Sequence, residues 1–231
     1  MPAFVLILAL TFAASPFWVP SFGGFDADQF PIPQVDPPVQ PEGYAFAIWG
    51  VIYLWMIAGA AFGVMRRWNA PDWTEMRLPL AVSLGVGSVW LPVAVRSPVW
   101  ATVLIWVMLI SALIALWRSP RLDPWAAAWP VGLYTGWLSA ASCVALGLLL
   151  AGYGLTSEQT AAWVTVSAAI LLAFAIQRSL GRAPTYGIAV IWALVAIAVQ
   201  NAFDPRSVGM LALLGAAVMV LPVIRSAVQK T

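Results

Sequence analysis

The side chains in this sequence that could act as nucleophiles are Ser139, Ser142 and Cys143, which lie close together inside an apolar run. Nucleophilic catalysis needs a neighbouring base that accepts the proton. The sequence has no histidine, and no Asp, Glu, Lys or Arg stands near the middle of its long apolar runs. Enzymes and ion-coupled transporters use such groups in the protein interior. We therefore expect neither an enzyme nor a pump, and no metal site.

Aromatic side chains are the second group whose spacing suggests chemistry. Trp49 and Tyr53 are four residues apart, which places both rings on one face of a helix. Trp90, Tyr134 and Trp137 follow in later apolar runs. Such rings fill helix-bundle cores and anchor membrane spans. They also stack on flat ligands, while the Tyr hydroxyl and the Trp N–H orient a polar edge. The residue types alone leave both roles open.

Composition favours lipid as the surroundings of these runs. Of the 231 residues, 62% are hydrophobic and 9% are charged, whereas soluble domains contain about 25% charged residues. The mean hydropathy is +0.90. The 11 Lys and Arg residues are scattered through short loops, so the clustered basic face of a nucleic-acid-binding protein is missing. We expect an integral membrane protein with lipid neighbours and no nucleic-acid partner.

The apolar runs predict an all-α integral membrane protein with about eight transmembrane helices. A spanning helix needs about 20 mainly apolar residues, because roughly 30 Å of hydrocarbon is crossed at about 1.5 Å per residue. The runs lack the alternation of a barrel wall, and charged, Pro or Gly residues separate them. The expected helices are 3–20, 44–65, 78–95, 98–117, 127–151, 160–177, 185–203 and 207–224.

Basic residues predict the orientation, because Lys and Arg accumulate in cytoplasmic loops. With eight helices, nine basic residues fall on one side of the membrane and two, Arg96 and Arg206, fall on the other. The sequence therefore predicts cytoplasmic termini, in a bacterial inner membrane. The nine are Arg66, Arg67, Arg77, Arg118, Arg121, Arg178, Arg182, Arg225 and Lys230.

Two segments allow alternative interpretations. The first apolar run is either a retained helix or a cleaved secretory signal, and the absence of Lys or Arg before it favours retention. Segment 21–43 contains five prolines, so we expect extended, semi-rigid coil. It is either a linker or a lid over the outer mouth of the helix bundle, where its Phe side chains would cover a cavity.

Three smaller features concern helix packing. Gly59–Gly63 and Gly132–Gly136 are small-xxx-small patterns that let helices approach closely, either within the chain or in a homodimer. Pro92 predicts a kink in the third helix. Gln200 and Asn201 either form hydrogen bonds between helices or cap the end of the seventh helix.

Three motifs occur in order along the chain. Residues 38–54 read Pro-Val-Gln-Pro-Glu-Gly-Tyr-Ala-Phe-Ala-Ile-Trp-Gly-Val-Ile-Tyr-Leu, and residues 89–92 read Val-Trp-Leu-Pro. Residues 130–142 contain Tyr134 and Trp137. Together the motifs resemble the signature of the TspO/MBR family, the tryptophan-rich sensory proteins, over its five-helix fold.

The resemblance implies a TspO-like five-helix domain at residues 1–151, followed by three additional helices at 152–231. It implies a membrane receptor or carrier for a hydrophobic tetrapyrrole such as a porphyrin, or a similar flat apolar ligand, in sensing, trafficking or regulation. No cofactor is required besides such a ligand or a bound lipid. The implied ligand-binding residues are Trp49, Tyr53, Trp90, Pro92, Tyr134 and Trp137, and the implied lid residues are Pro38, Pro41, Tyr44 and Phe46.

Departures from the family leave the ligand and the partners open. Gly87 stands where many relatives have Asn, and the three additional helices have no counterpart in short members. Relatives are often dimers, so a homodimer is one expected assembly. Two rival roles stay open. One is an accessory subunit that docks on a larger pigment or respiratory complex, and the other is an enzyme that degrades porphyrin photochemically with Trp participation.

Overall fold

The structure is a computed structural model that describes residues 1–19, 22–202 and 207–228. Within them the chain forms eight α-helices and no strand, which confirms the expected all-α class. Short 3-10 segments follow the first helix and precede the second. The helices are α1 (Pro2–Ala14), α2 (Ile48–Arg66), α3 (Pro71–Ala94), α4 (Pro98–Trp117), α5 (Ala128–Gly152), α6 (Glu158–Leu180), α7 (Thr185–Gln200) and α8 (Val208–Val228).

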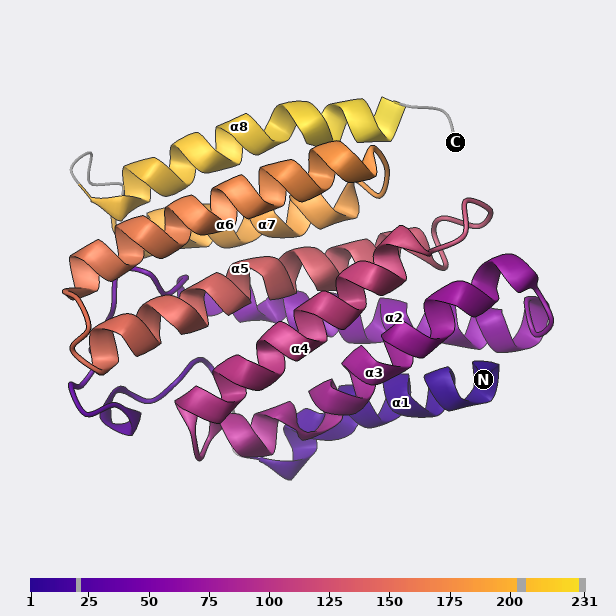
Figure 1. Ribbon diagram of the computed structural model, residues 1–231, viewed down its shortest axis with the longest axis horizontal. Helices are drawn as coiled ribbons and strands as arrows, with labels where there is room; N and C mark the ends of the chain where they lie inside the picture. The colour runs from indigo at the N-terminus through magenta and orange to yellow at the C-terminus, as the bar shows by residue number, and fades with distance from the viewer. Residues whose placement is uncertain (20–21, 203–206, 229–231) are drawn as a thin grey trace.

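Most of these helices are suited to a membrane. Among the described residues, six helices are long and apolar enough to cross it, namely α2 to α6 and α8. α1 with its 3-10 extension and α7 are shorter apolar helices. All of them run side by side as one bundle (Figure 1). The architecture is that of an integral membrane protein.

The first helix is shorter than the expected range 3–20. α1 ends at Ala14, and a 3-10 segment follows. Pro16 has no backbone N–H with which to continue the α-helical hydrogen bonding. The carbonyl of Phe12 accepts instead from the backbone N–H of Ser15 and from the Ser15 hydroxyl (2.7 Å). The proline therefore ends the α-helix inside the apolar run.

The third helix begins at Pro71, before the expected residue 78. Its first turns carry charged residues, which a criterion of continuous apolar sequence rejects. Arg77 is nevertheless buried. Its guanidinium donates to the carbonyls of Arg67 and Trp68 and to the Thr74 hydroxyl, so the turn between α2 and α3 satisfies the charged group.

The three C-terminal helices differ from the expected ranges at their ends. Polar end turns make α6 and α8 longer than 160–177 and 207–224, whereas α7 is shorter than 185–203. At the end of α7, the Asn201 amide donates to the carbonyl of Ile197 (2.8 Å) and to a carbonyl of the Pro-rich segment (2.9 Å). Asn201 therefore caps α7 and also links it to another part of the chain.

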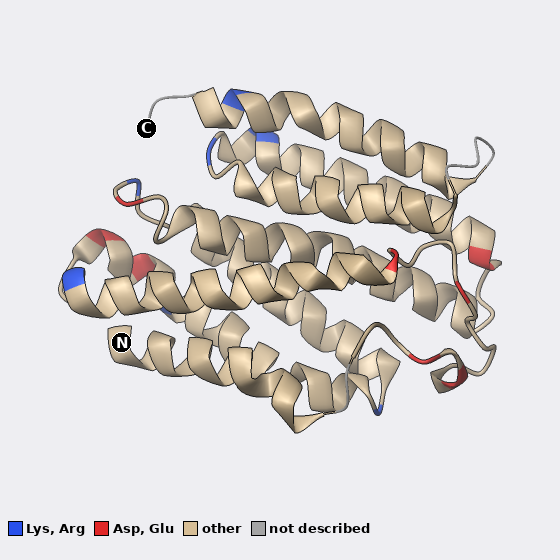
Figure 2. Cartoon of the chain, turned by 180° about the vertical axis from the view of Figure 1, so that it is seen from behind, with Lys and Arg blue, Asp and Glu red and all other residues tan. Residues whose placement is uncertain are grey.

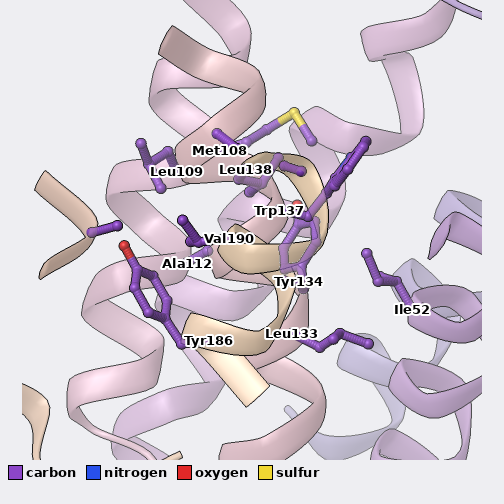
Figure 3. Close-up of a cluster of buried hydrophobic side chains, with 14 of the residues drawn as sticks. Ile52, Met108, Leu109, Ala112, Leu133, Tyr134, Trp137, Leu138, Tyr186 and Val190 are labelled. Carbon is purple, nitrogen blue, oxygen red and sulfur yellow. The ribbon is translucent and has the colours of Figure 1, made fainter. Parts of the chain in front are cut away.

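Helix α5 lies at the centre of the bundle (Figure 1). It packs against α2 and α4 and also against α6 and α7, while α1 lies on α2 and α3, and α8 lies on α6 and α7. Figure 3 shows the buried cluster around α5, with Tyr134 and Trp137 near Ile52 of α2 and Met108 of α4, and with Tyr186 of α7 at the other side. The helices α6 to α8 thus share a core with α1 to α5.

Both small-xxx-small patterns are packed inside the chain. A Cβ at Gly59 would collide with the carbonyl of Ala126, and a Cβ at Gly136 would collide with the carbonyl of Tyr186. The glycines therefore let α2 approach the segment before α5, and let α5 approach α7, at backbone contact distance. Of the two expected uses, the structure displays packing within the chain.

Charged side chains gather at the two ends of the bundle (Figure 2). The N-terminus and the last turn of α8 lie at the same end (Figure 1). Eight of the nine described Arg residues belong to the loops and helix ends there, and the ninth, Arg96, belongs to the other end. Arg206 and Lys230 lie outside the described residues. The helix order therefore segregates the basic residues as the sequence predicts.

Candidate ligand-binding site

An apolar cavity of about 280 Å³ lies between α1, α2 and α3, at the end of the bundle that carries the Pro-rich segment. Its lining is almost entirely hydrophobic, and no charged side chain takes part. The lining residues are Phe12, Pro16, Val19, Phe22, Phe46, Trp49, Tyr53, Gly87, Trp90, Leu91 and Met108.

Trp49 and Tyr53 form one wall of this cavity. Their rings are stacked, with centroids 5.4 Å apart and planes at 20°, as the four-residue spacing on α2 predicts. Phe12 of α1 stands edge-on to both, at 5.8 Å from Trp49 and 5.0 Å from Tyr53. The edge of one ring against the face of another is a favoured aromatic geometry. The wall is therefore fixed by contacts between two helices.

Trp90 of α3 closes the cavity from another side. Its indole N–H donates to the carbonyl of Ala101 on α4 (2.8 Å), which fixes the ring and uses its donor. Phe22, which follows α1, packs edge-on against it at 5.3 Å. Leu91 lines the cavity, whereas the next residue, Pro92, does not. The carbonyl of Pro92 accepts a hydrogen bond from Arg96.

The two aromatic residues of α5 occupy different places. Trp137 lines a smaller adjoining pocket of about 60 Å³, together with Pro41, Phe46 and Trp90. Tyr134 is fully buried, and its hydroxyl lies 2.9 Å from the Ser83 hydroxyl of α3. The structure thus brings Trp49, Tyr53 and Trp90 to one cavity, places Trp137 next to it, and holds Tyr134 behind the wall.

The Pro-rich segment lies across this end of the bundle and is tied to it at several points. The Ile32 amide donates to Gly152 at the end of α5 (2.9 Å), and the Gln29 side chain donates to Ala94 at the end of α3 (2.9 Å). The carbonyl of Pro38 accepts from Asn201 (2.9 Å). The segment is therefore a packed cover, in contrast to a loose linker.

The residues expected to form a lid are not equivalent. Phe46 lines both the cavity and the adjoining pocket, and Pro41 lines the pocket alone. Tyr44 is exposed and stands edge-on to Trp192 of α7 at 5.4 Å. Pro38 anchors the segment through its carbonyl. Two of the four thus face the hollow space, and two attach the segment to α7.

The cavity offers stacking surfaces and very few polar groups. Trp49 lines the cavity, and its indole N–H makes no hydrogen bond within the described part of the chain. Across the described ranges, no group of three or more His, Cys, Asp or Glu residues could hold a metal. The arrangement suits the binding of a flat apolar molecule, because aromatic faces and dispersion supply the attraction.

A family model described as TSPO-like protein matches residues 28–225. This match covers well over half of the chain. The chain belongs to the TSPO-like family. The matched region of this TSPO-like protein runs from the Pro-rich segment through α2 and every later helix to Arg225 of α8. Comparisons with curated proteins and with solved structures found no match.

Several lining residues were not among the candidates that the sequence suggested. Phe12 contacts three of the expected aromatic residues, and Met108 of α4 also lines the cavity. A Cβ at Gly87 would stand 2.7 Å from the Phe12 ring and 3.1 Å from the Met108 methyl group. These contacts join five helices, α1 to α5, and no local spacing encodes them. The small residue at position 87 is the one signal that a large side chain faces α3 there.

Proposed function

We propose that this TSPO-like protein is a non-enzymatic membrane receptor or carrier for a flat apolar ligand, with tetrapyrroles such as porphyrins as the chemical class. The supporting observation is the apolar cavity whose wall is the stacked pair Trp49 and Tyr53. A macrocycle on this wall would gain ring stacking, and the Trp49 N–H would donate to its polar edge.

The size of the hollow space bears on how such a ligand enters. Small-molecule pockets usually measure about 300–1,000 Å³, so a cavity of about 280 Å³ is slightly below this range. The adjoining pocket of about 60 Å³ shares Phe22, Phe46 and Trp90 with it. Of these three, Phe22 is the one outside the helices and 3-10 segments. In the proposed binding step, Phe22 moves aside with the Pro-rich segment and joins the two spaces.

The test is a titration of the purified protein with protoporphyrin, haem and a sterol, followed by quenching of tryptophan fluorescence. Saturable quenching by the tetrapyrroles is expected. Trp49→Ala removes half of the stacked wall, and an aromatic pair contributes about 0.5–1.5 kcal/mol. The dissociation constant for protoporphyrin should therefore rise about 2- to 12-fold.

Trp163→Ala is the matched control, because Trp163 is a partly exposed residue of α6 that does not line the cavity. Its affinity for protoporphyrin should equal that of the unaltered protein. If Trp49→Ala also binds with unchanged affinity while its helix content and melting temperature are retained, the ligand does not use this wall.

We also propose that the basic end of the bundle, with both termini, faces the cytoplasm of a bacterial inner membrane. The segregation of eight Arg residues to that end supports this orientation. Asp36→Cys places a thiol in the exposed Pro-rich segment, whereas the native Cys143 is buried. A membrane-impermeant maleimide should label this variant in intact spheroplasts. Labelling only after lysis would reverse the orientation.

A further inference from the structure

The opposite end of the bundle contains two further cavities beside the last turn of α8. One measures about 380 Å³ and lies among the loop before α5, the turn between α6 and α7, and the end of α8. The other measures about 270 Å³ and lies between the ends of α6 and α8. Ser226 lines both cavities. They are remote from the aromatic cavity, which lies at the end with the Pro-rich segment.

Four arginines line these cavities without a matching set of acidic groups. Arg121 and Arg182 line the larger one, and Arg178 and Arg225 line the smaller one. The one ion pair found in the described ranges joins Arg67 to Asp123, so it neutralises none of the four. This end of the bundle therefore carries an excess of positive charge around the two cavities.

Arg182 is held firmly in place. Its guanidinium donates to the carbonyls of Ser119 (2.8 Å) and Trp117 (2.8 Å), at the end of α4. The side-chain amide of Gln177 on α6 donates to the Arg182 carbonyl (3.0 Å) and stabilises the turn between α6 and α7. Burial, together with the nearby positive charge of Arg121, lowers the pKa of Arg182. An anion beside this pair would relieve the repulsion between the two guanidinium groups.

Apart from Ser226, the rest of the lining of the larger cavity is apolar, which bears on the kind of anion that fits there. Pro120, Trp129 and Val228 line the larger cavity. Leu221 and Ile224, which precede the α8 residues of this lining by one to two turns, have exposed apolar side chains. Exposed apolar side chains of a membrane-spanning helix face lipid. Guanidinium groups beside a lipid-facing apolar surface suit a phosphodiester that carries acyl chains. A free phosphate would use the charges but leave the apolar surface without a partner.

We propose that the larger cavity binds an anionic phospholipid, with its phosphate between Arg121 and Arg182 and its acyl chains along α8. The inference is independent of the tetrapyrrole site. The predicted cytoplasmic orientation of this end agrees with it, because the cytoplasmic leaflet is rich in anionic lipid and basic pockets between helices bind such headgroups.

The experiment uses the full-length protein in detergent micelles that contain equal amounts of phosphatidylglycerol and phosphatidylcholine, and counts retained lipids by native mass spectrometry. The protein should retain phosphatidylglycerol in preference. Arg121→Gln should lower that preference about fivefold, because one basic group near the membrane surface contributes about 1 kcal/mol. Arg121 is exposed, and its side chain has no hydrogen bond within the described ranges, so the variant should fold normally.

Arg66→Gln is the matched control, since it removes the same charge from an exposed residue at the same end that lines neither cavity. It should retain phosphatidylglycerol as the unaltered protein does. Equal losses in both variants, or no loss in Arg121→Gln, would overturn the proposal. Inorganic phosphate is added in a second arm. Displacement of the lipid by millimolar phosphate would assign the site to a soluble anion and would also overturn it.

Discussion

Asn201→Ala is expected to loosen the Pro-rich segment from the bundle. The Asn201 amide joins the end of α7 to the carbonyl of Pro38 at 2.9 Å. A hydrogen bond of this kind contributes about 1 kcal/mol net, so its loss should raise the opening equilibrium of the segment about fivefold. The second hydrogen bond, to Ile197, is local to α7. Its loss should fray that helix end without changing the segment.

Hydrogen–deuterium exchange followed by mass spectrometry measures this opening. The amides of Ile32, Gln34 and Glu42 donate hydrogen bonds in the closed segment, and their exchange should become about fivefold faster. Asn201→Asp, which keeps the size but loses both donors, should behave in the same way. Asn69→Ala, at the other end of the bundle, is the control and should leave the segment unchanged. If neither Asn201 variant changes exchange by more than about twofold, the tether does not hold the segment.

Two further predictions concern α5. Tyr134→Phe removes the hydroxyl that contacts Ser83, so melting in detergent should fall by about 2–4 °C. Protoporphyrin affinity should stay the same, because Tyr134 does not line the cavity; a large loss of affinity would place the ligand deeper in the bundle. Gly136→Ala should destabilise the protein, because the new Cβ meets the carbonyl of Tyr186. Gly50→Ala is the control, because its new Cβ meets no atom within 4 Å, and this variant should melt at the same temperature as the unaltered protein or at a higher one. Equal melting temperatures of the two variants would show that the close packing of α5 on α7 is dispensable.

The bounds of a helix were predictable where capping residues, prolines and charged residues mark its ends in the sequence. α4 has the expected bounds, because Ser97 caps its first turn, Pro98 occupies the first helical position, and Arg118 follows the last apolar residue. α3 was not predictable from residue 71, because its first turns are polar. The burial of Arg77 depends on carbonyls of the preceding turn. Only the folded turn offers these acceptors. Hydropathy along the chain therefore does not predict that α3 begins at residue 71.

The aromatic wall was predictable in part, for a similar reason. Spacing on one helix is sufficient to place Trp49 and Tyr53 together, and the stacked geometry follows from it. The sequence suggests Tyr134 as a ligand-binding residue and gives Phe12 no role, but the structure places them differently. Phe12, in a run that could pass for a signal peptide, lines the cavity, whereas Tyr134 is fully buried against Ser83. Which residue reaches the cavity depends on how the helices pack.

The proposed lid depends on α7, a helix beyond residue 151. The backbone N–H of Glu42 donates to the carbonyl of Ala196 (3.2 Å), and the indole N–H of Trp192 donates to the carbonyl of Ala45 (3.0 Å). Together with the bond from Asn201, these contacts fasten the stretch that leads into α2 and hence into the aromatic wall. α7 does not line the cavity of about 280 Å³. α7 therefore supports the cavity through the segment that covers it, and opening of residues 38–45 would break their contacts with α7.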